Sequence, residues 1–472
     1  MNEMRDLGST AHGGSGISDP AGRLASFAAS LRFEDIPERV RIRAAHHILD
    51  VVGIACVSTR YDFAHRTLSA IRPLAGPGDV PVLGTGVRLP PRDAALVNGL
   101  LCHALDFDDT HLGGVIHPSA SVFPAALSAA LMAGASGAAL LTAYIIGVEA
   151  ATRIGAVARG AFHDRGFHPT SAVGVFGCVL AAGRLAGLTA GELAAAQGIA
   201  LSMASGTFEF LEDGAWNKRL HAGWAAQAAI TAAALARQGF VGATSPYAGR
   251  FGLYNLFAAG GLAQRDLSIA TAGLGETWEI EQTAIKPYPA CHFTHACIDA
   301  ALLLREAGLR AEDVQSITAA VPEQIIPIVC EPAANKRRPS NSYDAQFSIP
   351  FLVAAALVRG QVTLKEIEAT NDPEILAVAA RIGYEIDPNS PFPKTYSGEL
   401  IVTTKDGRTL RQREEINRGA PERPLSNEDI IAKYRANAAL ALSPEAAERI
   451  EVAALGLAAA PSARALANDF AA

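Results

Sequence analysis

Apolar residues recur at helical spacing through most of the first half of the chain. Between Pro20 and Gly260 they stand three or four positions apart, and many of the predicted helices are apolar on two sides. A helix that is apolar on two sides is buried in a core and does not lie on the surface. After a predicted helix start at Ser18-Asp19-Pro20, the segments with this pattern are 36–58, 93–105, 140–158, 171–185, 190–204 and 222–238.

The pattern changes near Gly273. The segment TWEIEQTAIKPYP is predicted to be extended and is interrupted by proline, a helix follows over 294–306, and the period of two in VQSITAAVP predicts a strand. The run GELIVTTKDGRTLRQ predicts a hairpin that turns at Asp406-Gly407. Helical spacing returns at Ser426, and the interval from Ser426 to Asp429 is that of a capping box.

These patterns predict a mainly α fold with a large all-helical domain and a smaller inserted α+β domain. The helical domain takes residues 1–280 and 416–472, so that the C-terminal segment packs on the first, and the α+β domain takes residues 281–415. A chain of 472 residues buries about three quarters of its unfolded surface, so this fold needs no disulfide or metal to stabilise it.

Charge and cysteine content narrow the possible partners and the compartment. The formal net charge is −7, which disfavours binding to nucleic acids and to anionic membranes. The stretch from Pro118 to Val148 has no charge, but Pro124 and the break at 134–137 argue against a membrane span. Six scattered cysteines without a CxxC pair and a polar N-terminus without an apolar core indicate a reduced, cytoplasmic protein.

The densest group of reactive side chains lies in one short segment between two uncharged helices, CHALDFDDTHLGGVIHPS (102–119). A carboxylate beside a histidine orients the imidazole and raises its basicity, as acid–base catalysis requires. A helix cap or a turn also explains any one of these residues, but buried polar groups need partners, so the whole group favours a catalytic site. Its members are His103, Asp106, Asp108, Asp109, Thr110, His111 and His117.

Two further segments place polar side chains at predicted helix starts. His168 precedes Pro169-Thr170, and a helix N-terminus there attracts anions. Lys218 and His221 share one helix face in NKRLHAG, where Lys218 is suited to bind a carboxylate. The structural alternatives stay open, with Thr170 as a simple cap and Lys218 as a solvated lysine.

A third segment, KPYPACHFTH, brings Lys286, Cys291 and His292 to another helix start. A cysteine at a helix N-terminus has a lowered pKa, although inert packing is the commoner role and we favour it for Cys291. Downstream, Arg337 and Arg338 lie in a charged run that is either a solvated loop or a bidentate carboxylate binder.

The sequence contains no P-loop, GxGxxG fingerprint, GxSxG elbow or HExxH motif, and no cysteine cluster for an iron–sulfur centre. We therefore expect no cofactor and no metal. A remote alternative is a Mg²⁺-dependent prenyl-diphosphate enzyme, because DFDDT at 106–110 resembles an Asp-rich magnesium site. A helical scaffold without activity would show a repeat period, and none is present.

Taken together and in order, HALDFDDTH…HPS, GFHPT, NKRLHAG and KPYPACHFTH resemble the MmgE/PrpD family over nearly the whole chain. The resemblance implies a helical domain from both ends of the chain, a smaller lid domain, and a homodimer. It also implies a cofactor-independent enzyme that moves a proton beside a carboxylate of a small di- or tricarboxylate. A lyase, either a dehydratase or a decarboxylase, is the first expectation, and an epimerase of an iminodisuccinate-like substrate is the alternative.

The resemblance also implies roles for individual residues. His117 and His168 would move protons, Asp106 would orient one of them, and Lys218 would bind and stabilise a carboxylate. The remaining substrate contacts would come from Thr110, Lys286, Cys291, His292, Arg337 and Arg338. The chain departs from the decarboxylase branch at Cys291, where that branch has a histidine, and from the FPAEFH-type segment of the dehydratases. The choice between lyase and epimerase therefore stays open.

Overall fold

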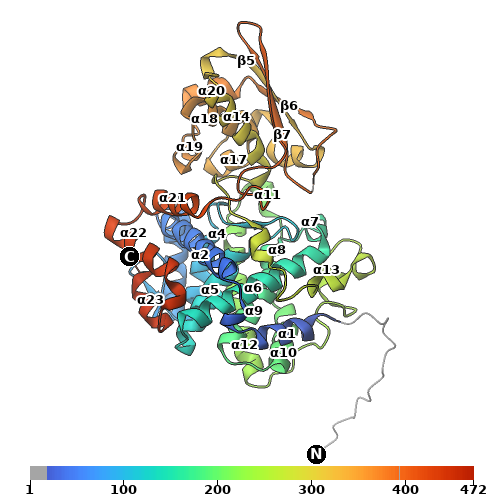
Figure 1. The fold of residues 1–472 in the computed structure, drawn as a ribbon, viewed down its shortest axis with the longest axis vertical. Coiled ribbons are helices and arrows are strands. Elements are labelled where there is room, and N and C mark those ends of the chain that lie inside the picture. The colour runs from blue at the N-terminus through green and yellow to red at the C-terminus, as the bar shows by residue number, and fades with distance from the viewer. Residues whose placement is uncertain (1–18, 393, 472) are drawn as a thin grey trace, which may run out of the picture.

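The computed structural model describes residues 19–392 and 394–471, which form a large helical body and a smaller α/β body above it (Figure 1). The expected start of the first helix at Ser18 falls outside these residues, but Asp19 accepts a hydrogen bond from the amide of Ala21 at 2.9 Å.

The large body takes helices from both ends of the chain. Its N-terminal helices are α1 (Ala21–Ser30), α2 (Glu38–Ser58), α3 (Asp62–Ala75), α4 (Pro91–His103), α5 (Pro118–Ala133), α6 (Gly137–Ala158), α7 (Ala161–Asp164), α8 (Pro169–Ala172), α9 (Gly174–Leu185), α10 (Ala190–Leu201), α11 (Phe210–Asp213), α12 (Asn217–Arg237) and α13 (Leu253–Phe257). The C-terminal helices are α21 (Asn427–Ala438), α22 (Pro444–Leu455) and α23 (Ala463–Asp469).

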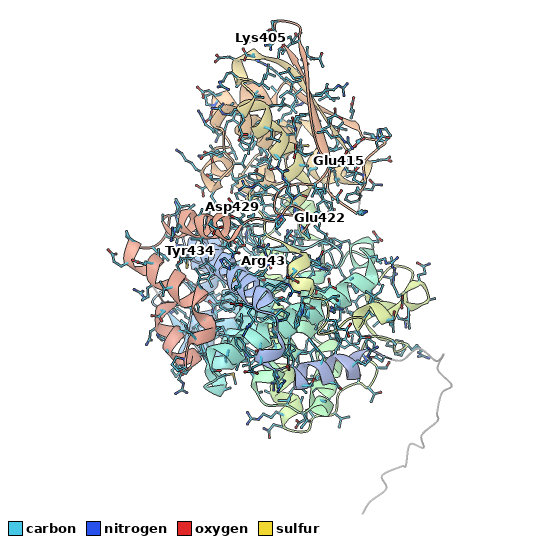
Figure 2. All side chains as sticks on the ribbon, in the orientation of Figure 1. Arg43, Lys405, Glu415, Glu422, Asp429 and Tyr434 are labelled. Atoms are coloured by element: carbon cyan, nitrogen blue, oxygen red, sulfur yellow. The ribbon has the colours of Figure 1, made fainter. Side chains whose placement is uncertain are left out.

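The C-terminal helices share the hydrophobic core of the N-terminal ones. Tyr434 on α21 is fully buried against α2, where a Cβ added at Gly53 would lie 2.8 Å from its ring. Arg43 on α2 donates a hydrogen bond to the carbonyl of Leu425 at 3.2 Å, and Figure 2 shows Arg43 and Tyr434 near each other in this body. The capping box predicted at Ser426 and Asp429 is present at the start of α21.

The smaller body has its own core and a mixed sheet. Its four strands run in the order β6-β5-β7-β8, with β5 parallel to β6 and the other pairs antiparallel. The strands are β5 (Val314–Val321), β6 (Ile382–Ile386), β7 (Gly398–Thr404) and β8 (Thr409–Glu414). The helices are α14 (His295–Glu306), α15 (Ile326–Val329), α16 (Ala333–Arg337), α17 (Ser342–Gln346), α18 (Ile349–Arg359), α19 (Leu364–Glu368) and α20 (Pro373–Ala379).

The predicted hairpin and the first predicted strand are present as β7–β8 and β5. Gly407 closes the hairpin turn with a φ of +87°, a backbone angle that favours glycine, and Lys405 lies at the tip farthest from the helical body (Figure 2). The extended segment expected after Gly273 is partly wrong, because a 3₁₀ turn occupies Glu279–Gln282. The sequence patterns did not identify the helices from α15 to α20.

Two short ladders complete the secondary structure, β1 (Val80–Pro81) with β2 (Arg88–Leu89), and β3 (Thr110–His111) with β4 (Thr283–Ala284). The second ladder matters for function because it joins the 102–119 segment to the chain that enters the smaller body. Thr110 lies opposite Ala284, so Lys286 is held close to the acidic cluster.

Helix α6 is long and apolar enough to cross a membrane, and 94% of the apolar window is buried inside the protein. The uncharged stretch from Pro118 to Val148 is divided between α5 and α6, which break at Gly134. All six cysteines are buried and free of disulfides.

Close packing between α4 and α12 depends on small residues. A Cβ added at Gly99 would lie 2.5 Å from the Cα of Gly223, and because this contact is with backbone, rotation of a side chain would not relieve it. We expect Gly99→Ala to lower the free energy of unfolding by about 1–3 kcal/mol, measured by chemical denaturation. Gly191→Ala on α10 is the control, since its Cβ meets no atom within 4 Å. Equal stability of the Gly99→Ala protein and the wild type would contradict this account of the packing.

Candidate active site

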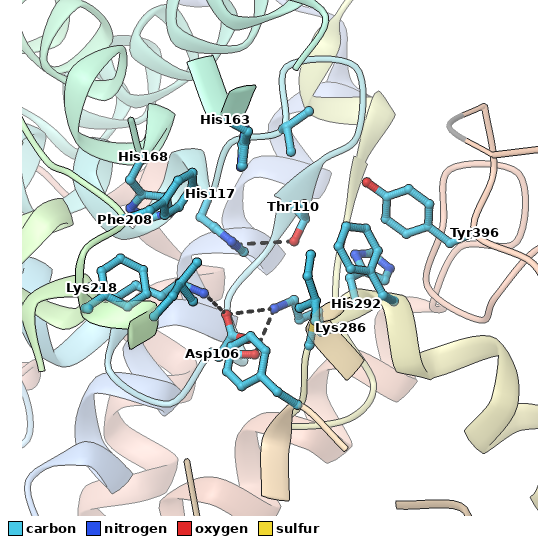
Figure 3. Close-up of a pocket in the computed structure, with 17 residues that line it drawn as sticks. Asp106, Thr110, His117, His163, His168, Phe208, Lys218, Lys286, His292 and Tyr396 are labelled. Atoms are coloured by element: carbon cyan, nitrogen blue, oxygen red, sulfur yellow. Dashed lines mark hydrogen bonds and ion pairs between the residues drawn. The ribbon is translucent and has the colours of Figure 1, made fainter. Parts of the chain in front are cut away.

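A cavity of about 290 Å³ lies where the two bodies meet. Both bodies contribute to its wall, and eight of the ten predicted site residues are among the lining side chains (Figure 3). The lining residues are Asp106, Thr110, Val115, His117, His163, His168, Phe208, Phe210, Leu211, Lys218, Lys286, Cys291, His292, Phe293, Ile328, Phe347 and Tyr396.

A buried carboxylate between two ammonium groups forms the centre of the site. Lys218 Nζ lies 2.6 Å from Asp106 Oδ1, and Lys286 Nζ lies 3.2 Å from the same oxygen. Lys286 also donates to the carbonyl of Asp106 at 2.8 Å. Burial alone would raise the pKa of Asp106, but Lys218 and Lys286 hold that pKa well below its usual range.

The position of Asp106 differs from the sequence-based expectation. We expected its carboxylate to orient a histidine, whereas its hydrogen-bond partners are the two lysines. Asp106 follows α4 with a left-handed φ of 51°. Aspartate tolerates this conformation better than most residues.

The geometry of His117 fixes its tautomer. It lies at the N-cap position of α5, and its Nδ1 is 2.8 Å from the carbonyl oxygen of Asp109, which only accepts hydrogen bonds. Nδ1 therefore carries the proton and Nε2 carries the lone pair. Burial lowers the pKa of His117 to about 3 against the opposing effect of Asp108, so the ring is neutral near pH 7. A neutral imidazole with a free Nε2 is a proton acceptor.

His103 and Asp108 lie next to the His117 ring. His103 Nδ1 donates to Asp108 Oδ2 at 2.7 Å, and its ring centroid lies 5.0 Å from that of His117. Both residues belong to the cluster found in the sequence, but nothing in the pattern separated them from Asp106. Asp108 is the carboxylate that lies near His117, at 3.7 Å.

The atoms of His103, Asp108 and His117 lie within 4.8 Å of one another, close enough to hold a metal ion. A metal ligand must offer a lone pair, and Nδ1 of His117 uses its proton to bond the Asp109 carbonyl. This hydrogen bond leaves Nε2 as the nitrogen of His117 that offers a lone pair.

A second pair of histidines lies beside His103 and His117. His168 Nδ1 and His221 Nδ1 lie 2.9 Å apart, so one nitrogen donates and the other accepts. The two rings therefore have opposite tautomers: the ring that donates through Nδ1 has its lone pair on Nε2, and the other ring carries its proton on Nε2. A proton gained at Nε2 of the first ring, passage of the Nδ1 proton to the second ring and loss of the Nε2 proton of the second ring together exchange the two tautomers. Burial lowers the pKa of His168, and it lowers that of His221 to about 4. The sequence placed His221 near Lys218 but gave no sign of its contact with His168.

Cys291 and His292 both line the cavity. Burial raises the pKa of Cys291 to about 11, so the thiol is protonated near pH 7 and is a poor nucleophile, as we favoured from the sequence. Asn417 donates to His292 Nε2 at 2.8 Å, which leaves the proton of that ring on Nδ1.

The structure does not bring Arg337 and Arg338 to the cavity. Both side chains are exposed, and Arg337 donates through Nε to the carbonyl of Ile382 at 3.0 Å. Arg337 is the last residue of α16 and Arg338 is its C-cap, and neither lines the cavity. The expected role of these arginines in binding a carboxylate therefore does not fit their position.

Sequence patterns missed the apolar part of the wall. Three of these residues share the segment 208–211 and the other four come from separate parts of the smaller body, so no single spacing in the sequence relates them. They are Phe208, Phe210, Leu211, Phe293, Ile328, Phe347 and Tyr396.

The helical body, the smaller body over it and the cavity between them define a class of protein, a two-domain enzyme with a cavity lined by lysines and histidines. The chain belongs to the MmgE/PrpD family. The N-terminal domain of that family matches residues 22–265, and the C-terminal domain matches residues 288–458. The family predicted from the sequence motifs is thereby confirmed.

The curated relatives are similar over most of their length. The chain is 31% identical to cis-aconitate decarboxylase of Homo sapiens over 433 residues, which cover 89% of this chain and 88% of that protein. It is 28% identical to cis-aconitate decarboxylase of Aspergillus terreus, over 92% of both chains. It is 25% identical to 2-methylcitrate dehydratase of Cupriavidus necator, over 87% of this chain and 88% of that protein. These relatives are carbon–carbon and carbon–oxygen lyases.

The buried neutral histidines predict a dependence of stability on pH. Burial lowers the pKa of His163 to about 4, whereas an unfolded histidine has a pKa near 6.5. As the pH falls from 6.5 to 4, the unfolded state takes up a proton that the folded state does not, so stability is lost.

We expect His163→Gln to reduce this loss by about 1.4 kcal/mol per pH unit relative to the wild type. The measurement is the free energy of unfolding of both proteins from pH 7 to pH 4. Asp50 and Glu149, whose pKa values are raised to about 6 and about 7, have the opposite effect but are common to both proteins. Parallel pH curves would contradict the assignment of a neutral, half-buried His163.

Proposed function

We propose that the protein is a cofactor-independent lyase that removes or delivers a proton beside a carboxylate of a small di- or tricarboxylate. The observation that carries this proposal is the shared Asp106 carboxylate, which holds two lysine ammonium groups in the same cavity as the free Nε2 of His117. The proton beside a carboxylate is very weakly acidic, so its removal needs a base and cations together.

The lysines retain hydrogen-bond capacity for a substrate. An ammonium group has three donors. Lys286 uses donors for the carbonyl and Oδ1 of Asp106, and Lys218 uses one for the same Oδ1. The remaining donors bind one substrate carboxylate and stabilise the negative charge that develops on it when the neighbouring carbon loses its proton. Asp106 holds both lysine side chains in position before the substrate arrives.

Two histidine groups supply the proton transfers. His117 takes the proton through Nε2, and the His168–His221 pair supplies a second group that either donates or accepts. Loss of water or carbon dioxide completes a lyase reaction, whereas return of a proton to the other face completes an epimerisation. The relatives named above support the lyase, because they decarboxylate cis-aconitate or dehydrate 2-methylcitrate.

We also propose that the enzyme is a homodimer, on the basis of the family resemblance, and that it is cytoplasmic, on the basis of its scattered, unpaired cysteines. Light scattering of the purified protein measures the first part directly.

The roles of His117 and Lys218 are tested by His117→Ala and Lys218→Ala. Each should reduce turnover at least about a hundredfold, because one loses the base and the other loses a cation beside the developing charge. The assay is proton NMR in D₂O with citrate, 2-methylcitrate, cis-aconitate, malate, tartrate and iminodisuccinate stereoisomers. Matched controls are His65→Ala and Lys365→Ala, exposed residues outside the cavity. Near-normal turnover in both site variants would exclude these roles.

The same assay distinguishes the reactions and tests the need for a metal. We expect turnover to be unchanged after treatment with EDTA, because the proposed proton transfers and charge stabilisation use only side chains of the protein. Loss of activity with EDTA and its recovery with a divalent ion would contradict the cofactor-independent mechanism. Interconversion of stereoisomers without loss of water or carbon dioxide would replace the lyase with the epimerase.

A further inference from the structure

Much of the cavity wall is apolar, although one end holds the lysines. Phe208, Phe210 and Leu211 come from the segment that forms α11, and Ile328 and Phe347 come from the smaller body. Figure 3 shows the Phe208 ring beside His168, away from the Lys286 ammonium group. The two bodies thus contribute apolar side chains to the same cavity.

Two of these side chains expose much of their apolar surface to water. Leu211 is 51% exposed on the helical body, and Ile328 is 37% exposed on the smaller body. A ligand that covers both side chains with an apolar group removes this surface from water, which is favourable in proportion to the area buried. A carboxylate in the same place would lose hydration and gain no partner.

The charge of the cavity is small. Among the described lining residues the charged groups are Asp106, Lys218 and Lys286, which sum to one net positive charge. Burial lowers the pKa of His117, His163, His168 and His292, so these rings add no charge near pH 7. Arg337 and Arg338 are exposed outside the cavity. One carboxylate of the substrate can therefore pair with cations, and any other carboxylate meets only uncharged hydrogen-bond donors such as Thr110 and Tyr396.

We infer that the substrate is a dicarboxylate with an apolar substituent in the position where a tricarboxylate has its third carboxylate. The first carboxylate binds Lys218 and Lys286, and the apolar group lies against Phe208, Leu211 and Ile328. This inference rests on the proposed function and names the substrate class of the same site. It accounts for the apolar lining, which proton transfer beside a carboxylate does not require.

Substituted malates provide a matched test, because citrate is malate with a carboxymethyl group on C2. The branched alkyl group of 2-isobutylmalate has nearly the same shape as carboxymethyl but no charge. Calorimetry with the wild-type protein should give a Kd that falls about fourfold for each methylene from 2-methylmalate to 2-propylmalate. Citrate should bind at least tenfold more weakly than 2-isobutylmalate.

Two other results of the binding measurements would contradict the proposals. Tighter binding of citrate or cis-aconitate than of every alkylmalate would overturn this inference and leave the proposed lyase in place. Failure of all these compounds to bind at millimolar concentration would overturn the proposed function, and the inference with it.

A variant tests the position of the apolar group. Ile328→Lys adds a cation at the edge of the cavity, where the side chain is already partly exposed, and should raise the affinity for citrate about tenfold relative to 2-isobutylmalate. Leu74→Lys is the control, since Leu74 is 81% exposed on α3, outside the cavity, and the ratio should not change. An unchanged ratio in the Ile328→Lys protein, with its fold confirmed by circular dichroism, would place the substituent elsewhere and overturn the inference.

Discussion

The Asp106 carboxylate is the interaction on which the site depends. A buried charge is costly unless it is paired, and here one buried oxygen is paired with ammonium groups from two different parts of the chain. Lys218 comes from the start of α12 in the helical body, and Lys286 comes from the segment that leads into the smaller body. The ion group therefore ties the two bodies together at the place where the cavity forms.

The helical body provides a rigid support for this ion group. Glycine and alanine let α4 and α12 approach closely, and the β3–β4 ladder holds the acidic segment against the segment before Lys286. The histidines His117 and His168 occupy the N-cap positions of two helices that begin with proline. Each ring is further fixed by a hydrogen bond at Nδ1. The positions of the acid–base groups are thus set by backbone structure, whereas the apolar wall comes from loops and short helices.

Burial has opposite effects on the two kinds of titratable group in the cavity. It keeps the imidazoles neutral, which suits proton transfer, but the close lysines overcome it at Asp106 and keep that carboxylate ionised. Charge is concentrated on three side chains as a result, and the rest of the cavity offers uncharged donors and apolar surface. Charged side chains and apolar side chains thereby line the same small cavity.

The sequence by itself determined the helical character, the hairpin at Asp406-Gly407 and most of the polar site residues. Local rules govern helix periodicity and turns, and reactive side chains that lie close together in short segments are visible without a structure. The partners of these side chains were decided only by the tertiary structure. Asp106 pairs with lysines 112 and 180 residues away, while Arg337 and Arg338 turn out to solvent. The His168–His221 contact and the apolar wall also join distant segments, because burial and pairing depend on how helices pack and not on their order along the chain.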